Sequence, residues 1–162
     1  MITPVNIGTD HIRGYIDAPI SIVEYGDYEC PYTGMAYPIV KEILKQFDTK
    51  VYFVFRNFPL IGIHPHAQHA AEAAEVAASQ DKFWQMHDYL FEHQKALDDN
   101  HLLQYAGKLR LDIIKFKKEV SEHTYAPLIE ESLKSGIDSG VKGTPTFFVN
   151  GELYNGSWDL DS

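Results

Sequence analysis

Side chains along residues 20–26 alternate between two faces, and this period of two predicts a β-strand. Ile20, Ile22 and Glu24 share one of those faces. A second strand is predicted over residues 51–55, because an almost unbroken apolar run is typical of a strand buried on both faces. Apolar residues between the two strands recur at helical spacing, so this part of the chain predicts a parallel βαβ unit.

Apolar residues also recur at helical spacing in five segments of the middle of the chain, which therefore predict five helices. These segments span residues 64–79, 81–95, 98–109, 112–120 and 124–138. Further on, Asn150-Gly151 separates two runs of strand-forming residues, 146–149 and 152–154, and predicts a hairpin with a type I′ turn. Near the N-terminus, Ile7 and Ile12 are candidates for an edge strand.

The composition is that of a globular protein, with 44% apolar and 13% aromatic residues. A length of 162 residues suits one domain, residues 1–162. The net charge of −9 argues against binding to nucleic acid or to an anionic membrane surface. The first residues lack the basic and apolar regions of a signal peptide, and one cysteine forms no internal disulfide, so a cytoplasmic location is expected.

Cys30 is the only cysteine of the chain and lies where the first predicted strand gives way to a helix. Free backbone N–H groups and the positive end of the helix dipole at such a junction stabilise a thiolate. Pro31 suits the first position of the helix, where its missing N–H costs nothing. The alternative is a buried, inert cysteine. We favour a reactive, partly exposed thiol at the start of the helix.

Glu24 is an acidic residue on an otherwise apolar strand face, six residues before Cys30. One interpretation is a solvated position at the edge of the sheet. The other is a buried carboxyl beneath the cysteine, which accepts or relays the proton of the thiol. We favour the second interpretation.

Two segments carry a resemblance to a known family. Residues 22–34 read Ile-Val-Glu-Tyr-Gly-Asp-Tyr-Glu-Cys-Pro-Tyr-Thr-Gly, and residues 143–151 read Gly-Thr-Pro-Thr-Phe-Phe-Val-Asn-Gly. They resemble the active-site strand with its helix start and the cis-proline loop with its hairpin in the DsbA-like branch of the thioredoxin superfamily. The resemblance covers the chain from about Pro19 onward and implies an α/β, thioredoxin-like fold with a helical insertion. The implied framework is residues 1–62 and 137–162, and the all-helical insertion is residues 63–136.

The resemblance also implies which residues form the site: Cys30, Thr33 and Glu24 for catalysis, and Pro31, Tyr32, Thr144 and Pro145 for substrate binding. Glu24 matches the place of the family's buried acid. Pro145 corresponds to the family's cis-proline, which turns the Thr144 backbone toward an extended substrate. The family also adds a C-terminal helix. Either Trp158 and Leu160 begin a short part of it here, or the sequence has been trimmed before it.

Thr33 stands where the family carries its second cysteine, and this departure changes the expected chemistry. The Thr33 hydroxyl can donate to the Cys30 thiolate, but it cannot resolve a mixed disulfide. The resemblance therefore implies a monothiol thiol-disulfide oxidoreductase that uses protein or peptide thiols and disulfides, with glutathione as a possible co-substrate and no resident cofactor. We expect a monomer or weak dimer. The alternatives are a redox-inactive peptide-binding or protein-binding module and a glutathione-using transferase.

His64, His66 and His69 form a His-x-His-x-x-His motif that suggests a metal site. No cysteine, aspartate or glutamate within the motif completes a ligand set. We therefore expect no metal here. The expectation is that these histidines cap a helix and line the loop near the active site.

Overall fold

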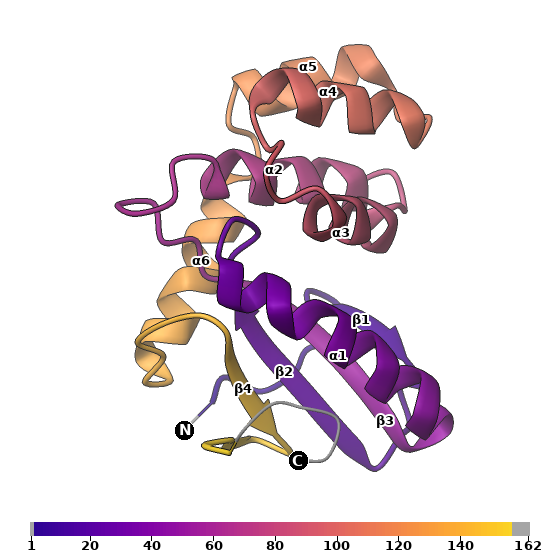
Figure 1. The fold of residues 1–162 in the computed structure, drawn as a ribbon, viewed down its shortest axis with the longest axis vertical. Helices are drawn as coiled ribbons and strands as arrows, with labels where there is room; N and C mark the ends of the chain where they lie inside the picture. Colours follow the sequence, from indigo (N-terminus) through magenta and orange to yellow (C-terminus); the bar gives the residue numbers. More distant parts are fainter. Residues whose placement is uncertain (1, 157–162) are drawn as a thin grey trace.

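A computed structural model describes residues 2–156, and its strands form one mixed sheet (Figure 1). Within these residues five strands lie in the order β1-β3-β2-β4-β5. Their bounds are β1 His11–Gly14, β2 Ile20–Gly26, β3 Val51–Asn57, β4 Thr146–Val149 and β5 Glu152–Leu153. This mixed sheet with its helices has the α/β architecture that the resemblance implies. Trp158 and Leu160, which were expected to begin a C-terminal helix, lie outside the described residues.

The centre of the sheet is the predicted βαβ unit. Strands β2 and β3 are parallel and are joined by α1 (Pro31–Phe47) and a short 3₁₀ helix (Asp48–Lys50). Strand β4 pairs antiparallel with β2, so that Glu24 lies opposite both Phe55 and Phe147. The side chain of Glu24 therefore starts from the middle of the sheet, with a neighbouring strand on each side.

The predicted hairpin is confirmed between β4 and β5. Asn150 and Gly151 have φ values of 49° and 83°, which a type I′ turn requires at both central positions. Strand β5 ends at Leu153, one residue earlier than predicted. The edge strand β1 contains Ile12 but not Ile7, which lies in a turn before it.

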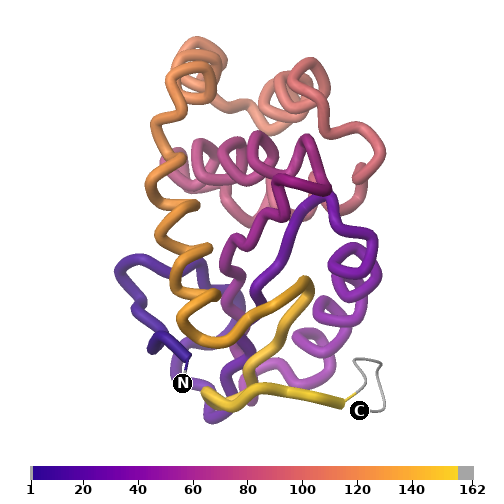
Figure 2. Tube along the Cα trace, turned by 90° about the vertical axis from the view of Figure 1, so that its left-hand side faces the viewer, coloured from indigo at the N-terminus to yellow at the C-terminus, as the bar shows by residue number. Residues whose placement is uncertain are grey.

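Helices cover the two faces of the sheet (Figure 2). Figure 2 shows α1 on one side of the strands and α6 (Ala126–Asp138) on the other. Val40 of α1 belongs to the apolar cluster that includes Phe53, whereas Leu133 of α6 packs with Val23 and Tyr25. Strand β2 thus presents Glu24 to the face that α1 covers.

The remaining helices gather beyond one end of the sheet, at the top of Figure 1. They are α2 Ala67–Ala78, α3 Phe83–Glu92, α4 Asp99–Lys108 and α5 Ile113–Ser121. Most residues of α2 are buried, because its many alanines let neighbouring helices approach closely. The predicted boundary at residue 136 falls inside α6, which packs on the sheet. Among residues 2–156 no helix combines the length and the apolar character needed to cross a bilayer.

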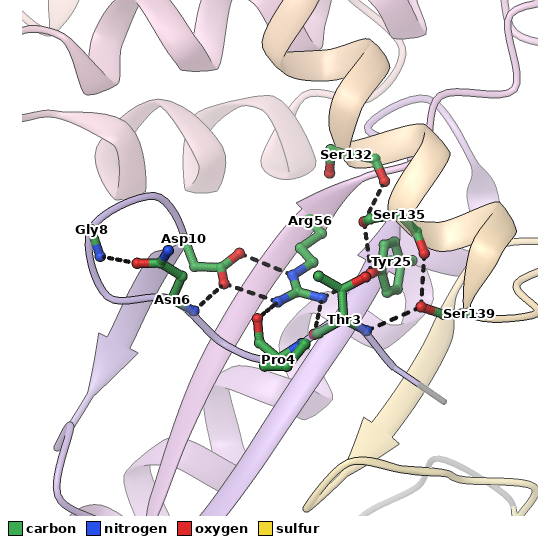
Figure 3. Close-up of polar contacts among 10 residues, drawn as sticks. All are labelled: Thr3, Pro4, Asn6, Gly8, Asp10, Tyr25, Arg56, Ser132, Ser135 and Ser139. Carbon is green, nitrogen blue, oxygen red and sulfur yellow. Dashed lines mark hydrogen bonds and ion pairs between the residues drawn. The ribbon is translucent and has the colours of Figure 1, made fainter.

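The buried guanidinium of Arg56 fastens the N-terminal segment to the sheet (Figure 3). It donates two hydrogen bonds of 2.9 Å to the Asp10 carboxylate and others to the carbonyl oxygens of Thr3 and Pro4. A further bond of 2.8 Å reaches the Tyr25 hydroxyl, which also pairs with Ser135 of α6. The Arg56 side chain therefore links the N-terminal segment to strands β2 and β3 and, through the Tyr25 hydroxyl, to helix α6.

Candidate active site

Cys30 is the N-cap residue of α1, and Pro31 follows it at the first helical position. The backbone of Cys30 is extended, with φ −70° and ψ 123°, and its carbonyl accepts a hydrogen bond from the Gly34 N–H at 3.0 Å. The cysteine therefore lies at the positive end of the helix dipole, as the sequence predicts.

The Cys30 sulfur is covered by the loop that contains Thr144, 114 residues further along the chain. Its Sγ atom lies 3.6 Å from the carbonyl oxygen of Thr144, within reach of a weak S–H···O hydrogen bond. The residue is only 3% exposed, so the expectation of a partly exposed thiol is wrong. The physical reason is that strand β4 pairs with β2 and so brings the preceding loop against the start of α1.

The loop over Cys30 contains a cis peptide bond between Thr144 and Pro145, both half-buried. The Thr146 hydroxyl donates to the Gly143 carbonyl at 2.6 Å and so closes the turn. The Thr144 hydroxyl oxygen is buried and has no hydrogen-bond partner among the described residues. The structure thus brings Thr144 and Pro145 to Cys30, while their contacts with a substrate stay a prediction.

The first turn of α1 presents apolar side chains to solvent beside the buried sulfur. Tyr32 is 63% exposed and Met35 is 60% exposed, and Pro31 is exposed as well. The substrate-binding role predicted for Pro31 and Tyr32 suits this exposure, because protruding apolar side chains are free to contact an incoming chain.

Thr33 is fully buried, on the inner side of the same turn. Its hydroxyl oxygen accepts a hydrogen bond from the Asp27 N–H at 3.4 Å, instead of bonding to the Cys30 sulfur. The predicted donation from Thr33 to the thiolate therefore has no counterpart in this geometry. The backbone of Asp27 lies nearer to that hydroxyl because the chain turns sharply between β2 and α1.

Glu24 is buried, with 3% of its surface exposed, so the interpretation as a solvated position is wrong. Burial raises the pKa of the Glu24 carboxyl to about 8. Its Oε2 atom has no hydrogen-bond partner among the described residues. A cavity of about 10 Å³, roughly the smallest that holds one water molecule, adjoins Glu24 and is also lined by Arg13 and Lys41. The carboxyl is thus poised to hold a proton near neutral pH.

Asp27 supports the site in a way that the sequence reading missed. Its Oδ1 atom accepts hydrogen bonds from the N–H groups of Glu29 and Cys30, at 2.7 and 3.2 Å. Its Oδ2 atom pairs with the Leu60 N–H and with His64 Nδ1, both at 2.8 Å. The available signal was an aspartate just before a helix start, where a carboxylate commonly accepts backbone N–H groups.

Gln94 is a second supporting residue that the sequence reading missed. Its amide nitrogen donates to the carbonyl oxygens of Tyr28 and Cys30, at 2.8 and 2.9 Å. A β-carbon at Gly34 would stand only 2.0 Å from the Gln94 amide oxygen, so glycine at that position makes room for the contact. No local pattern signals a contact across 64 residues.

The three histidines of the His-x-His-x-x-His motif lie in different parts of the structure and have different contacts. His64 lines the active-site loop through its bond to Asp27, as expected. His66 is the N-cap residue of α2, but its side chain makes no capping hydrogen bond. His69 bonds to Asp99 of α4.

Comparisons with known proteins agree with the fold. A family model described as Thioredoxin matches residues 6–162. Oxidised BdbD from Bacillus subtilis superposes with a TM-score of 0.86 and 28% identity, over 96% of this chain and 89% of that one. A thioredoxin-like oxidoreductase from Silicibacter pomeroyi gives a TM-score of 0.81 and 26% identity, over 94% and 87% of the two chains.

Curated relatives carry a different kind of name. The Na(+)/H(+) antiporter NhaA 1 of Salinispora arenicola is 46% identical over 162 residues, which is 100% of this chain and 25% of that protein. The Na(+)/H(+) antiporter NhaA 3 of Salinispora tropica is 44% identical over the same shares. The chain therefore spans about a quarter of the length of these relatives.

Proposed function

The chain belongs to the thioredoxin family, and we propose that it exchanges thiols and disulfides through a single thiol, that of Cys30. It has the fold of DsbA-like thiol-disulfide oxidoreductases. The observation that carries the proposal is the position of the Cys30 sulfur. It lies at the N-terminus of α1 and 3.6 Å from the Thr144 carbonyl, where an extended substrate would run.

The proposed reaction has three exchange steps, and the protein supplies the nucleophile for the first of them. The Cys30 thiolate attacks the substrate sulfur of a glutathionylated protein, an S–S bond forms, and glutathione leaves as a thiolate that takes up a proton. Thr33 has no sulfur to attack the mixed disulfide. An external thiol such as glutathione therefore attacks the Cys30 sulfur, forms a disulfide with it, and releases the substrate as a thiol. A further glutathione attacks this new disulfide and breaks it, which releases the Cys30 thiol and oxidised glutathione.

We assign the proton transfers in these steps to Glu24. A carboxyl with a pKa of about 8 holds and releases a proton near neutral pH, which is the range in which thiols exchange. The adjoining cavity beside Lys41 supports this role, because a water molecule there would link the carboxyl to the protein surface.

Substrate binding is assigned to the surface around the sulfur. The exposed side chains of Pro31 and Tyr32 offer apolar contacts on one side, and the backbone of Thr144 and Pro145 offers hydrogen bonds on the other. We propose protein or peptide disulfides and glutathione as partners, no resident cofactor, and a cytoplasmic location, where a single thiol stays reduced.

The test is to incubate the folded chain with oxidised glutathione and measure its mass. We expect one glutathione adduct on Cys30, which reduced glutathione removes. The Cys30→Ser variant is the matched control and should gain no mass. If the folded wild type gains no adduct while the urea-unfolded chain does, the thiol is closed to exchange and the proposal is wrong.

Burial of Cys30 favours one second candidate, a redox-inactive module that binds extended peptides. This candidate predicts that Cys30→Ala binds peptides as tightly as the wild type and that the wild type turns over no disulfide. Titration calorimetry with a peptide captured by the wild type, together with the turnover assay, separates the two candidates.

A further inference from the structure

A cluster of two histidines and a glutamate lies apart from the residues assigned to the active site. His69 and Glu72 lie on α2, and His123 lies in the turn between α5 and α6. One ligand atom from each of the three lies within 4.8 Å of the others. Within residues 2–156 this is the one group of three or more such side chains that is arranged to hold a metal ion.

Glu72 is a buried carboxylate without a permanently charged partner. Only 1% of its surface is exposed. Its oxygens contact the Gln68 amide at 3.3 Å and His123 Nδ1 at 3.0 and 3.2 Å. Burial of a carboxylate is costly unless a cation compensates it, and a neutral amide and a histidine compensate only in part.

His69 is oriented as a metal-binding histidine often is. His69 pairs through Nδ1 with Asp99 at 2.7 Å, which leaves Nε2 free to bind a metal. A carboxylate behind a ligating histidine is a common outer partner in zinc sites. His123 has a φ of 53°, an uncommon backbone conformation for a residue with a side chain, and this conformation occurs where the ring meets Glu72.

We propose that His69, Glu72 and His123 bind one divalent transition-metal ion of the Zn²⁺ class. Two imidazoles and one carboxylate suit zinc better than calcium or magnesium, which prefer oxygen ligands alone. His69 and Glu72 are three residues apart on one helix, so they face the same way. Ligand atoms around tetrahedral zinc stand about 3.3 Å apart, so modest side-chain rotation closes the cluster on the ion.

The metal would supply the positive charge that Glu72 lacks, and it would join α2 to the turn before α6. The His-x-His-x-x-His motif did not predict this site, because only His69 of the motif takes part. The other two ligands come from outside the motif, one of them 54 residues further along the chain. The expectation that there is no metal concerned that motif, whereas this proposal concerns a different set of ligands.

The experiment titrates the metal-free full chain with Zn²⁺ by calorimetry and by thermal unfolding. We expect one ion per chain, a raised Tm, and at least a tenfold loss of affinity in His69→Gln and in His123→Gln. His93→Gln is the matched control, since His93 is exposed and is not one of the three clustered residues; its side chain hydrogen-bonds to the Tyr89 carbonyl and stacks on the Tyr89 ring. Its zinc affinity should equal that of the wild type.

The Cys30→Ser variant distinguishes this site from zinc bound at the thiol. We expect it to keep the affinity of the wild type, and zinc X-ray absorption to show nitrogen and oxygen neighbours only, at about 2.0–2.1 Å. Circular dichroism checks that His69→Gln and His123→Gln keep their helix content. The proposal is overturned if the wild type binds no zinc, if both histidine variants bind it as tightly as the wild type, or if binding is lost with Cys30.

Discussion

The carboxyl oxygen Oε2 of Glu24 and the methyl carbon of Thr33 both lie close to the position that a side chain at Gly26 would occupy. A β-carbon at Gly26 would stand 3.1 Å from the first atom and 2.9 Å from the second. Glycine at this position therefore lets both side chains share one small space. It follows that a sulfur atom at position 33 would lie close to the acid that we assign to proton transfer.

Thr33→Cys should convert the site into a dithiol pair. Residues three apart in the first turn of a helix have α-carbons about 5 Å apart, within the range that a disulfide spans. We expect the variant to form an intramolecular disulfide and to reduce insulin, while the wild type stays inactive. Thr33→Ser is the control and should match the wild type. An inactive Thr33→Cys variant would mean that something other than the missing cysteine limits the site.

Glu24 should make the wild type less stable as the pH rises. Its pKa is raised from 4.5 to about 8 in the folded state, so the folded chain holds a proton that the unfolded chain releases between those values. The stabilising contribution is complete below about pH 4.5 and is lost by about pH 8, a loss of roughly 4–5 kcal/mol. Glu24→Gln should lack this loss of stability between about pH 4.5 and 8, because it removes the group that titrates.

Urea unfolding at several pH values measures this difference, with the exposed Glu130→Gln as control. Glu24→Gln should also slow thiol exchange near neutral pH if the carboxyl transfers protons. A Glu24→Leu variant that exchanges at the wild-type rate and is less stable than the wild type would instead make Glu24 a structural residue.

His87 should have the opposite dependence on pH. It is buried beside Tyr28, whose hydroxyl lies 2.9 Å from His87 Nδ1, and burial lowers the pKa of His87 to about 3. The His87 side chain binds a proton near pH 6.5 in the unfolded chain but only near pH 3 in the folded chain. The free energy of unfolding therefore falls as the pH drops from about 6.5 toward 3. His87→Gln should weaken this acid sensitivity in urea unfolding, and the exposed His93→Gln should leave it unchanged.

Arg56→Ala should be among the most destabilising single changes in the sheet. It leaves the Asp10 carboxylate and the Tyr25 hydroxyl without their shared donor in a buried place. Loss of one partner of a buried ion pair costs roughly 3–5 kcal/mol of unfolding free energy. Chemical denaturation should show this loss, whereas the exposed Arg110→Ala should change stability by less than about 0.5 kcal/mol. A loss below 1 kcal/mol for Arg56→Ala would mean that the N-terminal segment is held in another way.

The strands and helices were predictable because each is encoded by its own residues. Alternation along residues 20–26 and the apolar run that begins at Val51 identify β2 and β3, and Asn150-Gly151 identifies the final turn. Element ends were less accurate: α6 begins at Ala126, two residues after the predicted start. Local patterns report which face is apolar, but they do not fix where a helix frays.

The contacts that complete the site were not predictable in the same way. The bond from His64 to Asp27 crosses 37 residues, and the bond from Gln94 to Cys30 crosses 64. The cover over the sulfur depends on a loop even further along the chain. The first two contacts follow from how helices pack at the end of the sheet, and the third follows from the pairing of β4 with β2. The resemblance implies the third contact, but no periodicity in the sequence reports any of them.

The cover over Cys30 also affects how easily oxidants reach the thiol. A cysteine oxidised to sulfenic acid is normally rescued by a neighbouring thiol, whereas further oxidation to the sulfinic acid is in most proteins irreversible. This chain has no second cysteine to perform that rescue. With 3% of the residue exposed, the Thr144 carbonyl and the first turn of α1 restrict the approach of peroxide to the sulfur. Burial that slows the approach of peroxide therefore helps to keep the single thiol in its reduced form.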